Sequence, residues 1–132
     1  MNFPFANKCA STHWHGSTYI DTFRIRLRCQ RSDLNEHLHR GRNHDTGHCP
    51  YCPLIMEDVQ HFLMDCPQYA AARLLRDRTI HAAAQRTQIT PELLLGEPTG
   101  PLTKAQHSTI KKAIDLYLTT AAQTRFPGKY SK

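Results

Sequence analysis

Apolar residues near the end of the chain recur every three or four positions, which is the spacing of one face of an α-helix. The stripe consists of Ile110, Ala113, Ile114, Tyr117, Leu118 and Ala121. Thr103 and Gln106 precede it and match a capping box, a common helix start. We therefore predict a helix from this box to about Thr124, with its apolar face in the core.

Two short helices are predicted in the first half of the chain. The first covers residues 33–40, because Asp33 and Glu36 match a capping box and Gly41 is a typical residue just after a helix. The second covers residues 57–65, where apolar residues at helical spacing follow two acidic residues. Negative charge suits the positive N-terminal end of a helix.

A longer helix is predicted to start at Pro67, to end near Arg86 and to pack against the last helix. Its inner face is expected to hold Ala70, Leu74, Ala83 and Ala84, with Ile80 near that face. Most of its arginines are expected to be solvated. Thr90 followed by Pro91 then marks the start of one further helical turn.

Residues 21–30 fit two patterns. Apolar residues alternate with arginines there, which is the period of a strand. Ile20, Phe23 and Leu27 are also three and four residues apart, as on a helix. Spacing alone does not decide between them. The chain as a whole is predicted to be mostly α, a small helical domain stabilised by a metal site described below.

The chain has 132 residues, which suits one small domain. We divide it into an irregular segment 1–20, a helical zinc-binding domain 21–125 and a frayed tail 126–132. The formal charge of +6 favours a polyanionic partner. The chain does not open like a signal peptide, and no apolar run approaches a membrane span. We therefore expect an intracellular protein, in the nucleus or cytoplasm, with no membrane partner.

The residues with the clearest chemistry are Cys49, Cys52, His61 and Cys66, in the order C-x2-C-x8-H-x4-C. Two cysteines separated by two residues are typical of a tight metal-binding turn, which Pro50 stiffens here. Three thiolates and one imidazole are a common donor set for structural zinc. The pattern therefore predicts one structural Zn²⁺ per chain.

A simpler interpretation treats the cysteines as buried free thiols, which pack well as small apolar side chains. We favour the metal because four donors in order fall within one short segment. His44 and His48 lie just upstream and compete for a ligand position. Trp14 between His13 and His15 is better explained as a packing residue with two solvated neighbours than as a second metal site.

Six arginines lie between residues 24 and 42, upstream of the predicted metal ligands. The candidate nucleic-acid-binding residues are Arg24, Arg26, Arg28, Arg31, Arg40 and Arg42. Only Asp33 and Glu36 oppose them in that interval. The planar donor fork of arginine suits phosphate, so RNA or DNA is the expected partner, without any sign of base readout. The alternative is an ordinary solvated face on a surface helix.

No pattern in the chain predicts enzyme chemistry. There is no phosphate-binding glycine loop, no nucleophile elbow and no cluster of carboxylates for a two-metal site. A catalytic zinc keeps one position open for water, whereas three thiolates and an imidazole already fill four. We expect neither catalysis nor a small-molecule substrate.

Several segments combine into a longer pattern: residues 34–40 (LNEHLHR), 49–52 (CPYC), 57–63 (EDVQHFL) and 66–69 (CPQY), followed by Arg73. This pattern resembles the zinc-binding (CCHC) segment that lies C-terminal to the reverse transcriptase of non-LTR, LINE-type retrotransposons. The likeness is dense from Leu27 to about Arg73 and looser beyond it. All four metal-ligand positions are intact. The family's LRTGH stretch falls on residues 27–31, where its glycine and histidine are replaced.

The resemblance implies a helix at residues 21–30 and a role in holding RNA or target DNA during target-primed reverse transcription. In the parent elements the segment follows reverse transcriptase and often RNase H domains, so these are its implied protein partners. The polymerase activity is not carried over, because none of its catalytic residues is present here. Two other hypotheses stay open: a protein-interaction module that docks through its last helix, and a transposable-element relic without a selected function.

Overall fold

The computed structural model describes residues 19–42, 46–96 and 101–129. Its elements are α1 (Tyr19–Arg28), α2 (Asn35–Arg40), β1 (His48–Cys49), β2 (Cys52–Met56), the π-helical turn η2 (His61–Asp65), the 3₁₀ turn η3 (Pro67–Tyr69), α3 (Ala70–Ala83), α4 (Pro91–Leu95) and α5 (Lys104–Arg125). The domain is mostly helical, as predicted. Trp14, His44 and all but the last two residues of the segment 1–20 lie outside the described residues.

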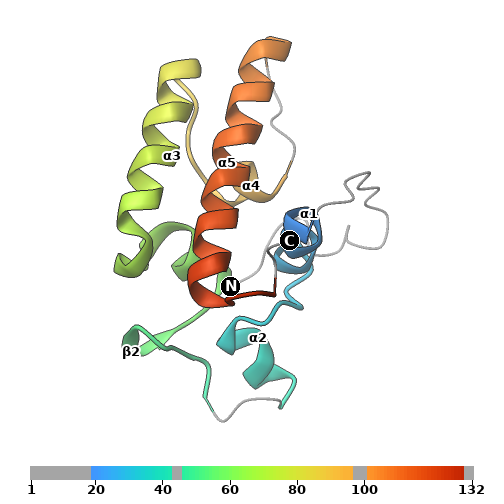
Figure 1. The fold of residues 1–132 in the computed structure, drawn as a ribbon, viewed down its shortest axis with the longest axis vertical. Helices are drawn as coiled ribbons and strands as arrows, with labels where there is room; N and C mark the ends of the chain where they lie inside the picture. The colour runs from blue at the N-terminus through green and yellow to red at the C-terminus, as the bar shows by residue number, and fades with distance from the viewer. Residues whose placement is uncertain (1–18, 43–45, 97–100, 130–132) are drawn as a thin grey trace.

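The longest helix, α5, lies beside α3 and runs antiparallel to it (Figure 1). It starts at the predicted capping box: the Gln106 N–H donates to Thr103 Oγ1 at 3.1 Å, and the Thr103 N–H donates to Gln106 Oε1 at 2.8 Å. Every residue of the predicted apolar stripe is buried. The predicted last helix and its packing against the helix after Pro67 are therefore confirmed.

Residues 21–28 are helical rather than extended, and residues 29 and 30 form a turn. The helical stripe of α1, made of Ile20, Phe23 and Leu27, is buried. The rings of Phe23 and Phe62 meet edge to face, with centroids 5.6 Å apart. Packing of this stripe against α4 and α5 decides between the two patterns, since a lone strand has no partner for its backbone.

The first residues after α5 were expected to be frayed, but they pack back onto the domain. The ring of Phe126 meets Phe23 edge to face at 5.8 Å between centroids. Lys129 Nζ lies 2.6 Å from a carboxylate oxygen of Asp33. Phe126 therefore adds to the core beside α1, while residues 127–129 are exposed.

The start of α2 differs from its prediction. Its N-cap is Leu34, and no side chain at that position caps the helix. The Leu34 N–H donates to Ser32 Oγ at 3.1 Å, and the Asn35 N–H donates to Glu57 Oε1 at 2.7 Å. The predicted cap at Asp33 is wrong, because a buried carboxylate from a distant segment takes its place.

The helix α3 ends at Ala83, before the predicted end near Arg86. Its inner face is also turned relative to the prediction. Ile80 is buried, but Leu74 is 52% exposed and Arg76 is only 1% exposed. The expectation that most arginines here are solvated fails at Arg76, which donates to Leu63 of η2 and also pairs with Asp77 of α3.

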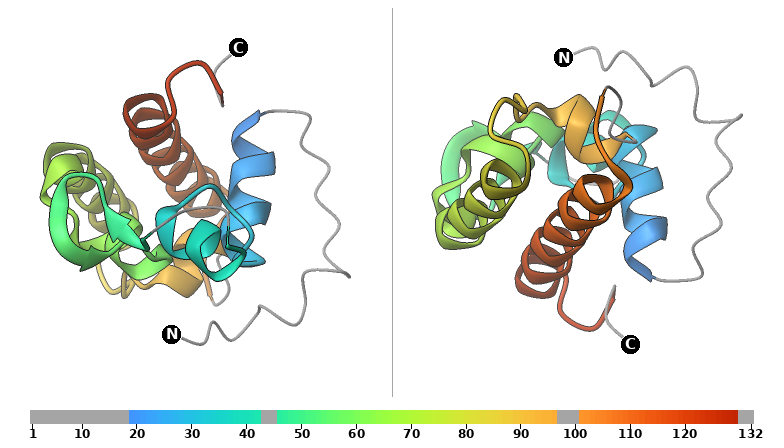
Figure 2. Two further views of the ribbon diagram at one scale, coloured as in Figure 1. Left: turned by 90° about the horizontal axis from the view of Figure 1, so that it is seen from below. Right: turned by 90° about the horizontal axis from the view of Figure 1, so that it is seen from above.

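Figures 1 and 2 show two parts of the molecule. We call residues 46–69 together with α2 the metal end, and α3 together with α5 the helix pair. The metal end includes a small hairpin that the sequence did not predict, in which His48 pairs with Met56 and Cys49 with Cys52. Among the described residues, no helix combines the length and the apolar character that a bilayer crossing requires.

Candidate metal centre

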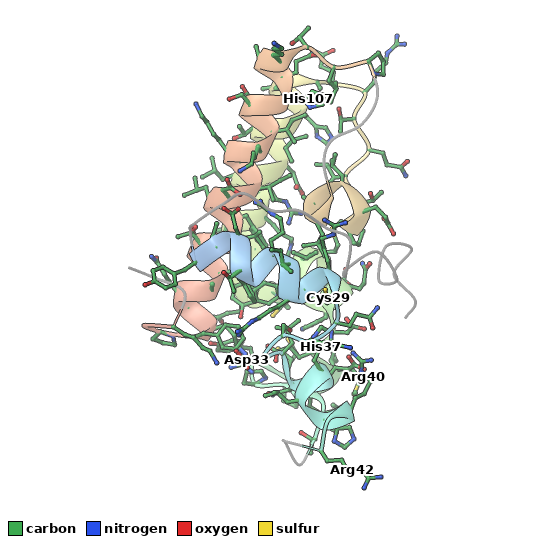
Figure 3. The ribbon with its side chains drawn as sticks, turned by 90° about the vertical axis from the view of Figure 1, so that its right-hand side faces the viewer. Cys29, Asp33, His37, Arg40, Arg42 and His107 are labelled. Atoms are coloured by element: carbon green, nitrogen blue, oxygen red, sulfur yellow. The ribbon has the colours of Figure 1, made fainter. Side chains whose placement is uncertain are left out.

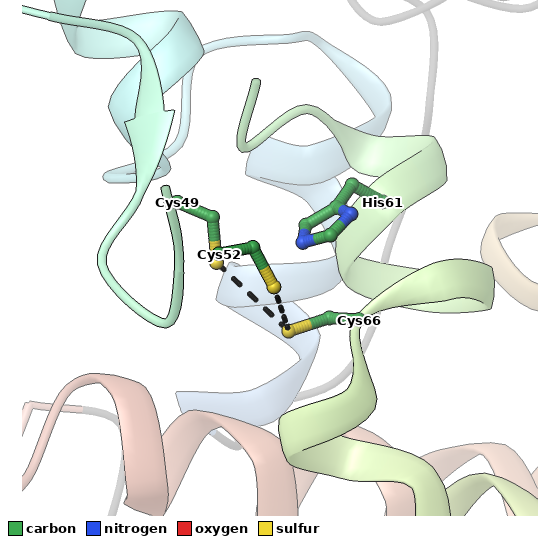
Figure 4. Close-up of side chains that lie close together, drawn as sticks. All are labelled: Cys49, Cys52, His61 and Cys66. Carbon is green, nitrogen blue, oxygen red and sulfur yellow. Dashed lines mark hydrogen bonds between the residues drawn. The ribbon is translucent and has the colours of Figure 1, made fainter. Parts of the chain in front are cut away.

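The four predicted ligands meet at the metal end. One donor atom from each of Cys49, Cys52, His61 and Cys66 lies within 4.8 Å of all the others, and all four residues are buried. The Cys66 sulfur lies 3.9 Å from that of Cys49 and 3.8 Å from that of Cys52 (Figure 4). A regular tetrahedral site with metal–sulfur bonds of about 2.3 Å separates its sulfurs by about 3.8 Å. The observed spacing fits such a site.

The hairpin supplies the first two thiols. Cys49 ends β1 and Cys52 begins β2, so the tight turn between them turns both side chains toward the same point. The backbone N–H of Tyr51 donates to the Cys49 sulfur, and that of Gln68 donates to the Cys66 sulfur. Both hydrogen bonds favour the thiolate form, which is the form that binds metal.

The other two ligands come from η2 and the residue after it. The Asp58 carboxylate accepts from the His61 N–H at 2.8 Å and so caps this turn. The Cys66 N–H donates to the His61 carbonyl at 2.8 Å, which is the five-residue hydrogen bond of a π-turn. Positions five apart on an α-helix are rotated by about 140°. The wider turn, with extended backbone at Cys66, brings the two side chains together instead.

Three side chains of the helix pair donate hydrogen bonds to backbone carbonyls in this turn or next to it. Arg76 Nη1 donates to Leu63 O at 2.7 Å, and Arg73 Nη1 donates to Cys66 O at 2.6 Å. The Tyr117 hydroxyl donates to Phe62 O at 2.6 Å. The first of these contacts gives the buried Arg76 a partner, and all three together fix the ligand turn against α3 and α5. The sequence did not predict these roles, because the spacing of residue types does not show which backbone carbonyls a π-turn leaves without a helical hydrogen bond.

A buried ion pair supports the hairpin from the other side. Glu57 is 1% exposed, and its carboxylate accepts from Arg125 Nε at 2.6 Å and Arg125 Nη2 at 2.9 Å. Arg125 also donates to Asn35 Oδ1 at 3.0 Å, while Asn35 Nδ2 donates to the His48 carbonyl at 2.6 Å. The end of α5, the start of α2 and strand β1 are therefore held by one hydrogen-bonded network.

Burial makes the metal-free cluster costly to ionise. It raises the pKa of the Cys66 thiol to about 12, and it also raises the pKa of Cys49. Nε2 of His61 is buried without a hydrogen-bond partner, although a buried ring nitrogen ordinarily has one. A cation among the three sulfurs and this nitrogen would stabilise the thiolates and satisfy the imidazole. The donor set therefore fits a metal ion.

The predicted arginine surface is only partly available. Arg24 is 3% exposed, and it is paired with Asp21 and with Asp115 of α5, so it has a structural role. Its inclusion among solvent-facing residues was wrong, because it lies on the inner side of α1. Arg28 is half-buried. The remaining four, Arg26, Arg31, Arg40 and Arg42, are exposed.

Of these four, the two at the end of α2 lie at the far tip of the metal end (Figure 3). Arg40 makes an ion pair with Glu36 at 2.8 Å and donates to the Gln30 carbonyl at 3.1 Å. Arg42 follows with a positive φ of 63°. The carboxylate of Glu36 offsets the charge of Arg40, so Arg42 contributes most of the exposed positive charge among the described residues of this tip.

The described histidine that competed for a ligand position, His48, is not part of the cluster. Its backbone pairs with Met56 in the hairpin instead. The cluster thus consists of the four predicted residues, and it can hold a metal ion by three sulfurs and one nitrogen. No protein-family model, no curated protein and no solved structure matches the chain.

Proposed function

We propose that the metal end binds one Zn²⁺ and that this ion has a structural role. The observation that carries the proposal is the buried cluster of three thiols and one imidazole, whose donor atoms lie within 4.8 Å of one another. Thiolate and imidazole ligands together select zinc over hard cations such as Mg²⁺ and Ca²⁺. Four protein donors complete a tetrahedral shell, so no position is left for a reacting water.

The test is elemental analysis of the purified chain alongside far-UV circular dichroism before and after strong chelation. We expect one zinc per chain and a loss of helical signal on chelation, because metal binding and folding are coupled in small sites of this kind. Cobalt substitution adds a spectroscopic check, since a tetrahedral thiolate-rich site absorbs strongly in the visible range.

The variant Cys66→Ser should lose the metal and the chelator response. A matched control is His48→Ser, because this histidine adjoins Cys49 but lies outside the cluster. If the purified chain contains no metal and chelation leaves its spectrum unchanged, the zinc proposal fails, and the cysteines are ordinary packing residues.

As a second candidate function, we propose that the zinc-stabilised domain binds RNA or DNA through phosphates. Two considerations support it: the chain carries a net charge of +6, and four of the six candidate arginines are exposed. The resemblance to the zinc-binding segment of LINE-type reverse transcriptases points the same way. A retrotransposon origin and an intracellular location, in nucleus or cytoplasm, are parts of this proposal.

Fluorescence anisotropy with labelled single-stranded and duplex oligonucleotides tests it. Affinity should fall linearly with the logarithm of salt concentration, with a slope of roughly −0.7 to −0.9 per phosphate contacted. The triple variant Arg31→Ala, Arg40→Ala, Arg42→Ala should reduce that slope by about 2.

The charge-matched control is Lys104→Ala, Lys111→Ala, Lys112→Ala on α5, which removes the same three charges from the helix pair. Equal losses in the two triple variants would mean that binding follows net charge rather than the arginine surface. No binding at low salt would overturn the proposal.

A further inference from the structure

The helix pair carries an apolar groove on its surface. Its volume is about 560 Å³, and every residue that lines it belongs to α3 or α5. The lining includes Ala71, Ala72, Leu75, Ala113, Leu116 and Tyr117. The groove lies away from the four metal ligands, none of which lines it.

Large and small apolar side chains line this groove together. Leu75 of α3 is 54% exposed and Leu116 of α5 is 52% exposed. Ala72 and Ala113 also line it, and their small side chains occupy little space. Exposed leucines on facing helices that enclose a hollow of this kind are typical of a protein interaction site.

The dimensions of the groove suit a helix. Lining residues run from Ala71 to Thr79 on α3 and from Thr109 to Thr120 on α5. At 1.5 Å per residue these stretches are about 12 and 16 Å long, which corresponds to two to three turns of a bound helix. A helix that docks in such a groove anchors itself by apolar residues at helical spacing.

The charged side chains that line the groove are positive. They are Arg76, which is buried, and Lys112, and no acidic residue is among the lining residues. Lys112 lines the groove itself and is exposed. An acidic partner is favoured here, and a second copy of this basic surface is not.

We propose that the groove binds an amphipathic helix of another protein, one with a leucine-rich face flanked by acidic residues. The leucines would enter between Leu75 and Leu116, and an acidic residue would meet Lys112. Residues 1–18 of the chain itself contain Phe3, Phe5 and Trp14 but no acidic residue, so they lack the matching charge.

The test uses the metal-loaded full chain and three synthetic peptides of about 16 residues, long enough to form helix. The first has leucines at helical spacing flanked by glutamates. The second has the same leucines flanked by lysines, and the third keeps the glutamates but replaces the leucines with serines. Backbone amide shifts in ¹H–¹⁵N spectra report the site of binding.

We expect only the first peptide to shift the amides of residues 71–79 and 109–120, with an affinity that falls as salt rises. Leu75→Gln with Leu116→Gln should weaken it at least about tenfold, and Lys112→Glu should also weaken it. Leu54→Gln is the matched control, because this leucine is 84% exposed but lies on β2.

Three results would overturn the proposal. The first is equal binding of the acidic and basic peptides, or no binding of either at millimolar concentration. The second is a dimer in sedimentation that Leu116→Gln abolishes, which would assign the groove to a second copy. The third is a shift of the groove amides when residues 1–18 are removed, which would assign it to the chain's own first segment.

Discussion

The metal end and the helix pair are ordered by different kinds of contact. At the metal end, a hairpin and a single π-turn are held by a thiol–imidazole cluster and by the buried Glu57–Arg125 pair. Its strand β2 leaves Leu54, Ile55 and Met56 at 84%, 50% and 41% exposure. In the helix pair, α5 instead buries a continuous apolar stripe. The metal end also buries Val59, Phe62 and Leu63, so its polar cross-links add to apolar burial, whereas the contacts of α5 with α3 are mainly apolar.

The two parts are coupled by polar groups that the helix pair extends toward the metal end. Arg73, Arg76 and Tyr117 each bind a carbonyl at or beside η2, and Arg125 binds Glu57. These donors belong to helices that pack against each other by apolar contacts. The helix pair therefore holds the ligand turn in position. Loss of the metal should therefore affect the metal end first.

Removal of the metal should produce the largest effect. If the proposed site holds a metal ion, strong chelation should reduce amide protection in residues 47–69 by more than about 100-fold, because metal binding would then supply most of the free energy that orders this segment. Protection in residues 110–118 should fall less, since apolar packing remains there. Hydrogen exchange followed by mass spectrometry or NMR measures both regions in one sample.

Equal loss of protection in both regions would contradict the comparison and would show that the domain unfolds as one unit. The metal-loaded protein in the presence of a weak, non-competing chelator serves as the control. Cys66→Ser should reproduce the chelated state without any chelator.

Breaking the buried ion pair comes next. Glu57→Gln should lower the free energy of unfolding by about 4 kcal/mol, because it leaves the largely buried Arg125 guanidinium without its counter-charge. Equilibrium urea denaturation measures the change. The effect should vanish in the chelated protein if the pair stabilises the metal end alone. An equal effect with and without metal would show that the pair belongs to the common core.

The sequence predicted the helix pair better than the metal end, for a physical reason. Helical spacing and the Thr103–Gln106 box are local signals, and both were confirmed. The four donors were also recognised from their spacing, and the structure brings them together. Contacts between distant segments were missed: the pairing of Glu57 with Arg125 joins residues 68 positions apart.

The same limit explains two errors. The outward interpretation of Arg24 failed because Asp21 and Asp115 meet it on the inner side of α1. The cap predicted at Asp33 is wrong, because the carboxylate of Glu57 accepts the hydrogen bond from the Asn35 N–H at the start of the helix. In each case a local pattern was overridden by a partner that only the folded chain brings close.

A cavity in the helix pair should be costly in both metal states. Leu118 is fully buried on α5, so Leu118→Ala should lower the free energy of unfolding by about 3 kcal/mol. Urea denaturation with and without chelator measures it. Leu116→Ala on the same helix is the control, because this leucine is 52% exposed and should cost well under half as much. Similar losses in the two variants would contradict the assignment of the core face.

Acid should weaken the metal end through His37. Burial, and then the charge of Arg40, lower the pKa of its imidazole from the usual 6.5 to about 4. Its Nδ1 accepts from the Ser32 N–H at 3.1 Å, so the folded state requires an unprotonated nitrogen there. Between these two pKa values the unfolded chain binds a proton that the folded chain does not, so stability falls as pH drops from about 6.5 to about 4.

At pH 5 the loss from this group should be about 2 kcal/mol relative to pH 7. Titration of the imidazole by NMR gives the pKa directly, and a midpoint near 6.5 would contradict the prediction. Comparison with His37→Asn separates this contribution from metal release at low pH, because release affects both proteins alike.

The smallest expected effect distinguishes a true helix cap from a surface ion pair. Thr103→Ala removes the side chain that accepts the Gln106 N–H, so it should cost about 1 kcal/mol. Asp33→Ala removes a carboxylate whose partner Lys129 is half-exposed, so it should cost a few tenths of a kcal/mol.

Both changes are measured by urea denaturation, at low and at high salt. Salt should reduce only the Asp33 effect, since solvent ions screen an exposed pair but not a backbone hydrogen bond. A larger, salt-independent cost at Asp33 would show that it caps α2 after all, and that Glu57 alone does not hold the start of that helix.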